Sequence, residues 1–300
     1  MKKTRTLEFS IINIKLQPRT PDRTGKYIKL MKLAAENRQS VPVHGPRHGC
    51  INSAYIEERF EKEVVTGELV TFTNIDTDGA WHNVITGKEA DPTAVEKVKD
   101  PLRNLQPDRK TFRYFFYPED HVMIYLSKNR TSRLTPNQAV WLLKEVLNTE
   151  EMRAALQVRT IEVQAMTDAQ QILDVFSEYK VNYLHVDFTK PNDSSSDIGK
   201  SIEEIFEEEH VKREEIKKWA DETGSIQPNE QTKKLIEAGA KDGKVEIRAK
   251  DDDGEKKTFN TQKMPIVEQV QYSVDYPLFN FCFEKADKML EKYVKKTNPK

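Results

Sequence analysis

Residues 109–126 read RKTFRYFFY, PED and HVMIYL in turn: an aromatic run, a break and a second apolar run. Both runs are rich in the aromatic and β-branched residues that favour strands. Pro118 cannot donate a backbone hydrogen bond to a neighbouring strand, and Asp120 favours a tight turn. The pattern therefore predicts an antiparallel hairpin whose two strands are joined at residues 118–120.

A helix start follows this hairpin, with a full set of capping residues. Thr135 can act as the N-cap, Pro136 occupies a position where a missing N–H costs nothing, and Gln138 can close a capping box. A basic loop at residues 127–133 connects the hairpin to this helix, predicted over 136–147. The apolar stripe of the helix consists of Val140, Leu142, Leu143, Val146 and Leu147.

The order strand, polar loop, helix occurs three times, at residues 7–37, 122–148 and 183–209. This weak repeat predicts an α+β fold in which helices pack on one face of a mainly antiparallel sheet. We expect two domains, residues 1–160 with the aromatic hairpin and residues 161–300 with the charged helices. A ferredoxin-like topology for each half is the first candidate.

Two further segments carry structural predictions. Ile11 and Ile12 are adjacent in an otherwise alternating strand, which indicates either a bulge or a strand covered on both faces. Residues 203–222 are rich in Glu and Lys and predict a charged helix, with Trp219 among its buried residues. That helix offers a candidate surface for a protein partner.

Composition narrows the class of protein. Hydrophobic residues make up 37% and charged residues 32% of the 300 residues, which indicates a core wrapped in charged helices. Lys and Arg number 48 against 49 Asp and Glu, and this net charge of −1 argues against a nucleic-acid coat over the whole surface. Two widely separated cysteines, Cys50 and Cys282, fit a reducing cytoplasm. No run reaches transmembrane length, so we expect a cytoplasmic protein without membrane contact.

Basic residues gather on the hairpin and on the loop after it. Arginine and lysine bind phosphates and aromatic rings stack on bases, so this mixture is a candidate platform for RNA or single-stranded DNA. The alternative is that the aromatic strands are simply core. The candidate nucleic-acid-binding residues are Arg109, Lys110, Arg113, Lys128, Arg130 and Arg133. Arg130 and Arg133 are expected to form an anion site with the N-terminus of the 136–147 helix.

A second candidate site lies at residues 44–50, which read HGPRHGC. Its imidazoles and thiol could bind zinc, or His44 or His48 could act as acid or base beside Arg47 in a metal-independent endoribonuclease. A Gly/Pro loop does not fix both rings on one face, so an ordered loop without chemistry is the simpler interpretation. Other catalytic and cofactor motifs are absent from the sequence, and we expect no cofactor and no metal.

Three segments together resemble a family of uncharacterised bacterial and prophage proteins found in phage-defence neighbourhoods. They read LEFSIINI at residues 7–14, YFFYPEDH at 114–121 and DFTKPND at 187–193. The resemblance covers most of the chain and implies a context, antiviral defence, without implying a reaction. We therefore expect a non-catalytic accessory protein that binds nucleic acid or a protein partner. An endoribonuclease and a protein-interaction scaffold remain the alternatives.

Overall fold

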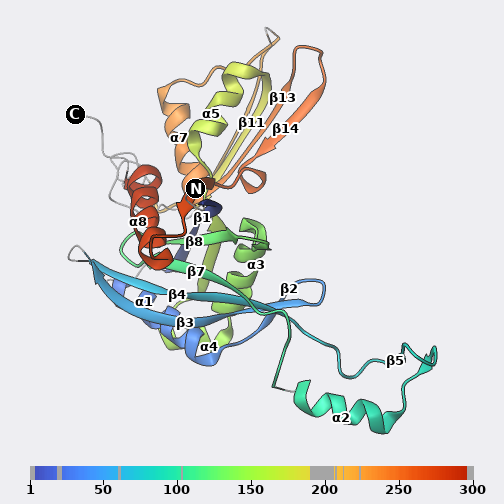
Figure 1. Cartoon of the computed structure of the whole chain (residues 1–300). Helices are drawn as coiled ribbons and strands as arrows, with labels where there is room; N and C mark the ends of the chain where they lie inside the picture. Colours follow the sequence, from blue (N-terminus) through green and yellow to red (C-terminus); the bar gives the residue numbers. More distant parts are fainter. Residues whose placement is uncertain are drawn as a thin grey trace.

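The computed structural model describes residues 4–18, 22–59, 62–102, 104–189, 206, 208–211, 213–222 and 224–295. Two sheets organise these residues, a nine-stranded sheet and a four-stranded sheet above it in Figure 1. Every strand pairing in both sheets is antiparallel. The predicted α+β class with a mainly antiparallel sheet is confirmed.

The nine-stranded sheet has the order β10-β1-β8-β7-β4-β3-β2. In addition, β15 pairs with β1 and β9 pairs with β8. Its strands are β1 (Thr4–Gln17), β2 (Val41–His44), β3 (Arg47–Arg59), β4 (Lys62–Thr73), β7 (Lys110–Tyr117), β8 (Val122–Asn129), β9 (Ser132–Arg133), β10 (Thr160–Ala165) and β15 (Val267–Ser273). The predicted aromatic hairpin is confirmed as β7 and β8, with Tyr117 opposite Val122.

β1 is an inner strand of this sheet and is buried on both faces. One face carries Leu7, Phe9 and Ile11, and the other carries Ile12, Ile14 and Leu16, each group in a different hydrophobic cluster. The adjacent isoleucines therefore continue a normal alternation, because each face meets apolar partners. The interpretation of a strand covered on both sides is confirmed. The register shift against β8 falls earlier, between Glu8 and Phe9.

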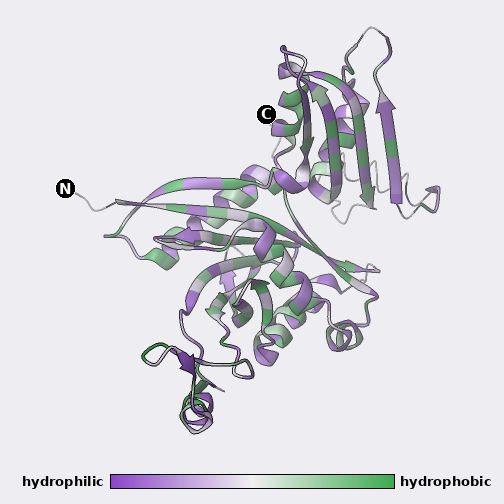
Figure 2. Cartoon of the chain, turned by 90° about the vertical axis from the view of Figure 1, so that its right-hand side faces the viewer, coloured by the Kyte–Doolittle hydropathy of each residue, from purple (hydrophilic) through white to green (hydrophobic). Residues whose placement is uncertain are grey.

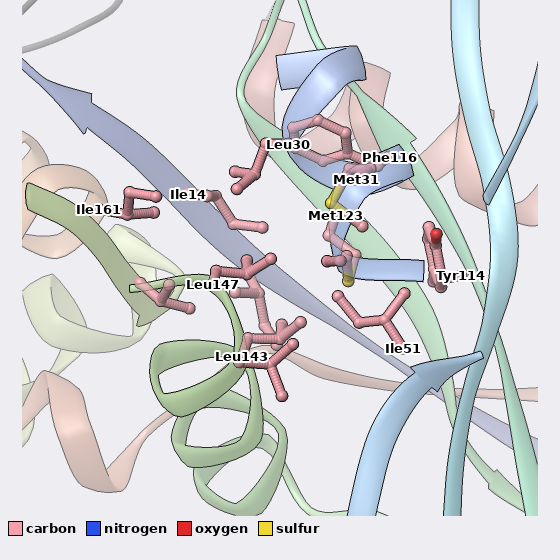
Figure 3. Packing of buried hydrophobic residues seen from close by; sticks show 14 of the residues in the cluster. Ile14, Leu30, Met31, Ile51, Tyr114, Phe116, Met123, Leu143, Leu147 and Ile161 are labelled. Atoms are coloured by element: carbon pink, nitrogen blue, oxygen red, sulfur yellow. The ribbon is translucent and has the colours of Figure 1, made fainter. Parts of the chain in front are cut away.

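Helices cover both faces of the nine-stranded sheet, which corrects the prediction of helices on one face. One face packs against α1 (Arg23–Asn37), α3 (Pro136–Leu147) and α4 (Glu150–Leu156). Figure 3 shows Leu143 and Leu147 of α3 and Leu30 and Met31 of α1 turned toward residues of the sheet. The other face packs against α8 (Leu278–Leu290), which continues into a π-helical segment, Glu291–Lys295. The helix on this second face, α8, comes from the C-terminal region. The periodicity of the strands does not show which distant helix covers which face of the sheet.

The predicted capping box at the N-terminus of α3 is present. Thr135 Oγ1 accepts a hydrogen bond from the Gln138 N–H, and the Gln138 side chain accepts one from the Thr135 N–H. Leu142, Leu143, Val146 and Leu147 are buried in the core, as the stripe predicted. The start of this helix is therefore fixed by its own sequence.

The four-stranded sheet has the order β12-β11-β13-β14. Its strands are β11 (Lys180–Thr189), β12 (Arg213–Trp219), β13 (Gly243–Lys250) and β14 (Lys256–Asn260). α5 (Ala169–Glu178) and α7 (Glu230–Asp242) lie on the same side of the sheet in Figure 1. A 3-10 turn, Thr261–Lys263, leads away from β14. Leu184, Val186 and Phe188 of β11 form its core with the two helices.

The charged helix predicted over residues 203–222 is wrong for its second half. Residues 213–219 form β12, in which exposed and half-buried side chains alternate. Pairing with β11 overrides the helix propensity of Glu and Lys, because one face of the strand packs toward the core and the other meets water. Residues 203–205, 207 and 212 of the predicted helix lie outside the described residues, and the surface for a protein partner stays a prediction.

Residues 74–108 form an arm that extends from the nine-stranded sheet (Figure 1). It contains the short strands β5 (His82–Asn83) and β6 (Lys88–Glu89) and the helix α2 (Pro92–Leu102), which has no buried residue. Residues 92–102 of this arm are thus helical without contributing a buried side chain.

The two halves do not have ferredoxin-like topologies. β1 pairs along one edge with β15 in its first part and with β10 in its second part. Strands from beyond residue 160 therefore complete the sheet begun by the first half, and the predicted boundary at residue 160 falls inside the nine-stranded sheet. The residue pattern within a strand does not indicate which distant strand it pairs with, so these pairings could not be predicted from local sequence.

Candidate nucleic-acid interface

The aromatic residues of the β7–β8 hairpin belong to the core. Phe112, Tyr114, Phe116 and Tyr125 are fully buried. The Tyr114 hydroxyl donates to the Ser53 carbonyl at 2.8 Å, and burial raises the pKa of Tyr114. Rings without exposed faces cannot stack on bases. The alternative interpretation, that these strands are core, is the correct one for the rings.

Two of the basic candidates meet at one buried carboxylate, Glu8 of β1. Arg133 and Lys128 lie 2.8 Å and 3.3 Å from its two oxygens, and the Gln269 amide donates to it at 3.2 Å. Glu8 is only 2% exposed, so its charge requires these partners. Arg133 and Lys128 thus already hold an anion that belongs to the protein.

Arg130 differs from these two residues. It occupies the turn between β8 and β9 in a left-handed conformation, with φ of 56°, and it is exposed. Of the two arginines in the predicted anion site, Arg133 is tied to Glu8, and the site itself stays a prediction. The first N–H groups of α3 are served in part by its own capping box.

The remaining hairpin candidates also have partners. Arg109 lies 3.4 Å from Glu68, and Lys110 lies 3.0 Å from Asp108. The Arg113 guanidinium stands 5.6 Å from the centre of the Phe279 ring of α8. Each of these charges is at least partly compensated within the fold, which weakens its attraction for a phosphate.

The residues of the second candidate site lie on the β2–β3 hairpin. His44 is opposite Arg47, whereas His48 is opposite Pro42. The His48 ring tilts against Phe72 at 6.4 Å, Arg47 pairs with Asp108 at 3.7 Å, and Cys50 is buried. The two imidazoles are therefore held in different surroundings. Within the described parts of the chain, no group of three His, Cys, Asp or Glu residues is placed to hold a metal ion.

A surface that sequence reasoning missed is the outer face of the four-stranded sheet, the face turned away from α5 and α7. Strand alternation in β11 buries Leu184, Val186 and Phe188 and turns Tyr183, His185 and Asp187 outward. Figure 2 shows hydrophobic and hydrophilic residues alternating along these strands. Among the described residues, no helix covers this outer face (Figure 1).

One row across this face combines aromatic rings with a guanidinium. Trp219, Tyr183 and Arg248 are register partners on β12, β11 and β13. The rings of Tyr183 and Trp219 lie 5.5 Å apart, and the Arg248 guanidinium stands 4.7 Å from the Tyr183 ring centre. Trp219 is 68% exposed. We name these three residues the aromatic row.

The charges beyond the aromatic row neutralise one another. The Arg213 guanidinium donates two hydrogen bonds, of 2.7 and 2.5 Å, to the Asp187 carboxylate. Glu215 pairs with Lys217 at 2.7 Å, and this contact lowers the pKa of the Glu215 carboxyl. Within the aromatic row, the Trp219 indole is the ring exposed to solvent, whereas the Tyr183 ring lies under the Arg248 guanidinium, which pairs with Glu246 at 3.0 Å.

A signal for this surface existed in the sequence. Tyr183, His185 and Asp187 alternate with apolar residues, which marks the second face of a half-buried strand. Because Trp219 was predicted to be a buried residue of a helix, it was not recognised as a neighbour of Tyr183 on a paired strand. Arg248 could join only through the pairing of β11 with β13, which spans more than sixty residues of sequence.

Within the described residues, no helix has both the length and the apolar character needed to cross a membrane.

Comparisons with known proteins give a family and little else. No curated protein matches the chain. The DNA polymerase sliding clamp from Caulobacter crescentus aligns with 92% of this chain at 6% sequence identity, but the TM-score is 0.09. The alignment spans about half of that protein, 56%, and it carries no argument about fold or function. The model of the domain of unknown function DUF4747 matches residues 5–276, so the chain belongs to that uncharacterised family.

Proposed function

We propose that this protein is a non-catalytic accessory protein that binds single-stranded nucleic acid, RNA or DNA, on the outer face of its four-stranded sheet. The single observation that carries the proposal is the aromatic row, in which an exposed indole, a phenol and a guanidinium stand side by side. Single exposed apolar residues are common on protein surfaces, whereas a Trp, a Tyr and an Arg grouped in one row call for a reason beyond folding.

Stacking gives that reason. Nucleobases are flat and present π-faces, and both aromatic rings and guanidinium planes bind them. Every base has such a face, so this contact tolerates many sequences. The bases of a duplex are already stacked on one another, and only an unpaired strand offers them to a sheet face. We therefore expect preference for single strands over duplex.

Removal of the indole tests the proposal. Base–aromatic stacking contributes about 1–3 kcal/mol per base, so Trp219→Ala should weaken binding by at least about fivefold. The matched control is Trp141→Ala, which removes a second half-exposed indole that donates to Pro42 on the nine-stranded sheet. Fluorescence anisotropy with labelled single-stranded RNA, single-stranded DNA and duplex provides the affinities. Equal affinities for wild type and Trp219→Ala would refute the proposal.

We also propose that this binding serves a bacterial antiviral defence system in the cytoplasm. The support is the resemblance of residues 7–14, 114–121 and 187–193 to proteins of phage-defence neighbourhoods. A plaque assay with the wild-type gene in its native operon should show protection, and Trp219→Ala should reduce it. Protection that is identical in the two strains would separate the defence role from nucleic-acid binding.

A further inference from the structure

A row of lysines lies next to the aromatic row on the same outer face. Lys180, Lys250 and Lys256 are register partners on β11, β13 and β14, so their side chains stand side by side. On β13 the row lies one alternation step from Arg248, about 7 Å along the strand. On β11 a register shift between Val181 and Tyr183 separates Lys180 from the aromatic row. All three lysines are exposed. We name Lys180, Lys250 and Lys256 the lysine row.

The lysine row is unfavourable for the fold itself. Like charges placed directly opposite each other destabilise an antiparallel pair. No ion pair among the described residues involves these three lysines, whereas Lys217 and Lys244 on the same face are paired with Glu215 and Glu246. Lysines on an edge strand discourage aggregation, but β11 and β13 are inner strands. Stability therefore gives no account of this row.

A pocket opens beside Lys180 and Lys250 of the lysine row. Its volume is about 450 Å³, and it is also lined by Asn182, Ala220, Gly224 and Gly254. Asp221, Asp251 and Asp252 also line it. Asp251 is engaged within the turn, because it pairs with Lys257 at 3.3 Å and accepts the Glu255 N–H. Asp252 is exposed on the pocket wall and opposes an anionic ligand.

We propose that the lysine row binds the phosphates of the strand whose bases stack on Trp219 and Tyr183. This inference rests on the proposed function and deepens it, because it fixes how the strand lies. The bases lie over the aromatic row and the sugar–phosphate backbone follows the lysine row across β11, β13 and β14. The ligand is then an anionic single strand rather than a free base or an uncharged aromatic compound.

The test measures the salt dependence of binding. Removal of one lysine–phosphate contact should make the slope of log K against log salt concentration shallower by about 0.7. The triple variant Lys180→Gln/Lys250→Gln/Lys256→Gln removes three such contacts and should make the slope for single-stranded DNA shallower by about 2. The control Lys217→Gln/Lys244→Gln, which removes paired lysines, should keep the wild-type slope. Asp252→Asn should strengthen binding, because it removes a negative charge from the pocket wall.

Two further measurements, the melting temperature and the tryptophan fluorescence, distinguish misfolding, failure of the lysine-row proposal and failure of the proposed function. The triple variant should melt at or above the wild-type temperature, since repulsion has been removed. Saturating DNA should still quench its tryptophan fluorescence, and this quenching should disappear when Trp219→Ala is added. An unchanged slope in the triple variant, with Trp219→Ala still defective, would overturn the lysine row alone. A marked loss of melting temperature would overturn it too, because the lysines would then be structural. Equal binding by wild type and Trp219→Ala would instead overturn the proposed function.

Discussion

The buried carboxylate of Glu8 gives the sharpest prediction about stability. Glu8 is 2% exposed and is held by Arg133 at 2.8 Å, Lys128 at 3.3 Å and the Gln269 amide at 3.2 Å. A hydrogen bond to a charged group contributes about 1.5–3 kcal/mol, so Arg133→Ala should lower the free energy of unfolding by about 2 kcal/mol. Removal of both cations leaves an unpaired buried charge, and Lys128→Ala/Arg133→Ala should cost about 3–5 kcal/mol.

Urea unfolding followed by circular dichroism measures these losses. The control is Arg130→Ala, which changes an exposed turn residue two positions before β9 begins and should cost under about 0.5 kcal/mol. Glu8→Gln should rescue much of the double variant's loss, because the amide needs no cation. A double variant that loses less than about 0.5 kcal/mol would contradict the assignment of these residues to a buried ion cluster.

Three further outcomes follow from the described contacts. A Cβ on Gly67 would lie 2.0 Å from the Ser53 carbonyl oxygen and 2.6 Å from the Tyr114 hydroxyl. Gly67→Ala should therefore lower the free energy of unfolding, measured in urea, by about 1–3 kcal/mol or more. An unchanged midpoint would contradict this packing. Burial raises the pKa of the Cys282 thiol to about 12. Only about one molecule in ten thousand then carries the thiolate at pH 8, so alkylation should be slow until urea unfolds the chain. Rapid labelling of the native protein would refute that burial. His44 and His48 have different surroundings; wild type and His44→Ala/His48→Ala should leave labelled RNA equally intact in chelator, and cleavage by wild type alone would revive the endoribonuclease.

The local parts of the fold were predictable from the sequence. The β7–β8 hairpin and the cap of α3 depend on residues within thirty positions of one another, and turn and capping preferences fix them. The burial of β1 on both faces also follows from its two apolar faces. These elements needed no knowledge of distant partners.

The assembly of the sheets was not predictable from the same patterns. β10 reaches β1 across about half of the chain and β15 across most of it, and α8 comes from the C-terminal region to cover the second face. β12 has the composition of a helix and becomes a strand because β11 pairs with it. The aromatic row depends on that pairing, so Trp219 was predicted to be buried when it is exposed.

The basic residues show the same limit. Arg133 and Lys128 look like free cations in the sequence, and only the position of Glu8 on a neighbouring strand shows that they are paired. Conversely, the lysines of the lysine row are far apart in the chain and become one feature only through the register of β11, β13 and β14. Charge in a sequence is therefore an unreliable guide to charge available on a surface.

Ultraviolet crosslinking of single-stranded RNA to the intact protein, followed by mass spectrometry of the peptides, tests the central claim most directly. Stacked aromatic side chains lie in contact with the bases. The account predicts crosslinks at Tyr183 or Trp219, which should disappear when excess unlabelled single strand competes. Crosslinks confined to residues 109–133, or none at a concentration at which RNA is bound, would contradict it.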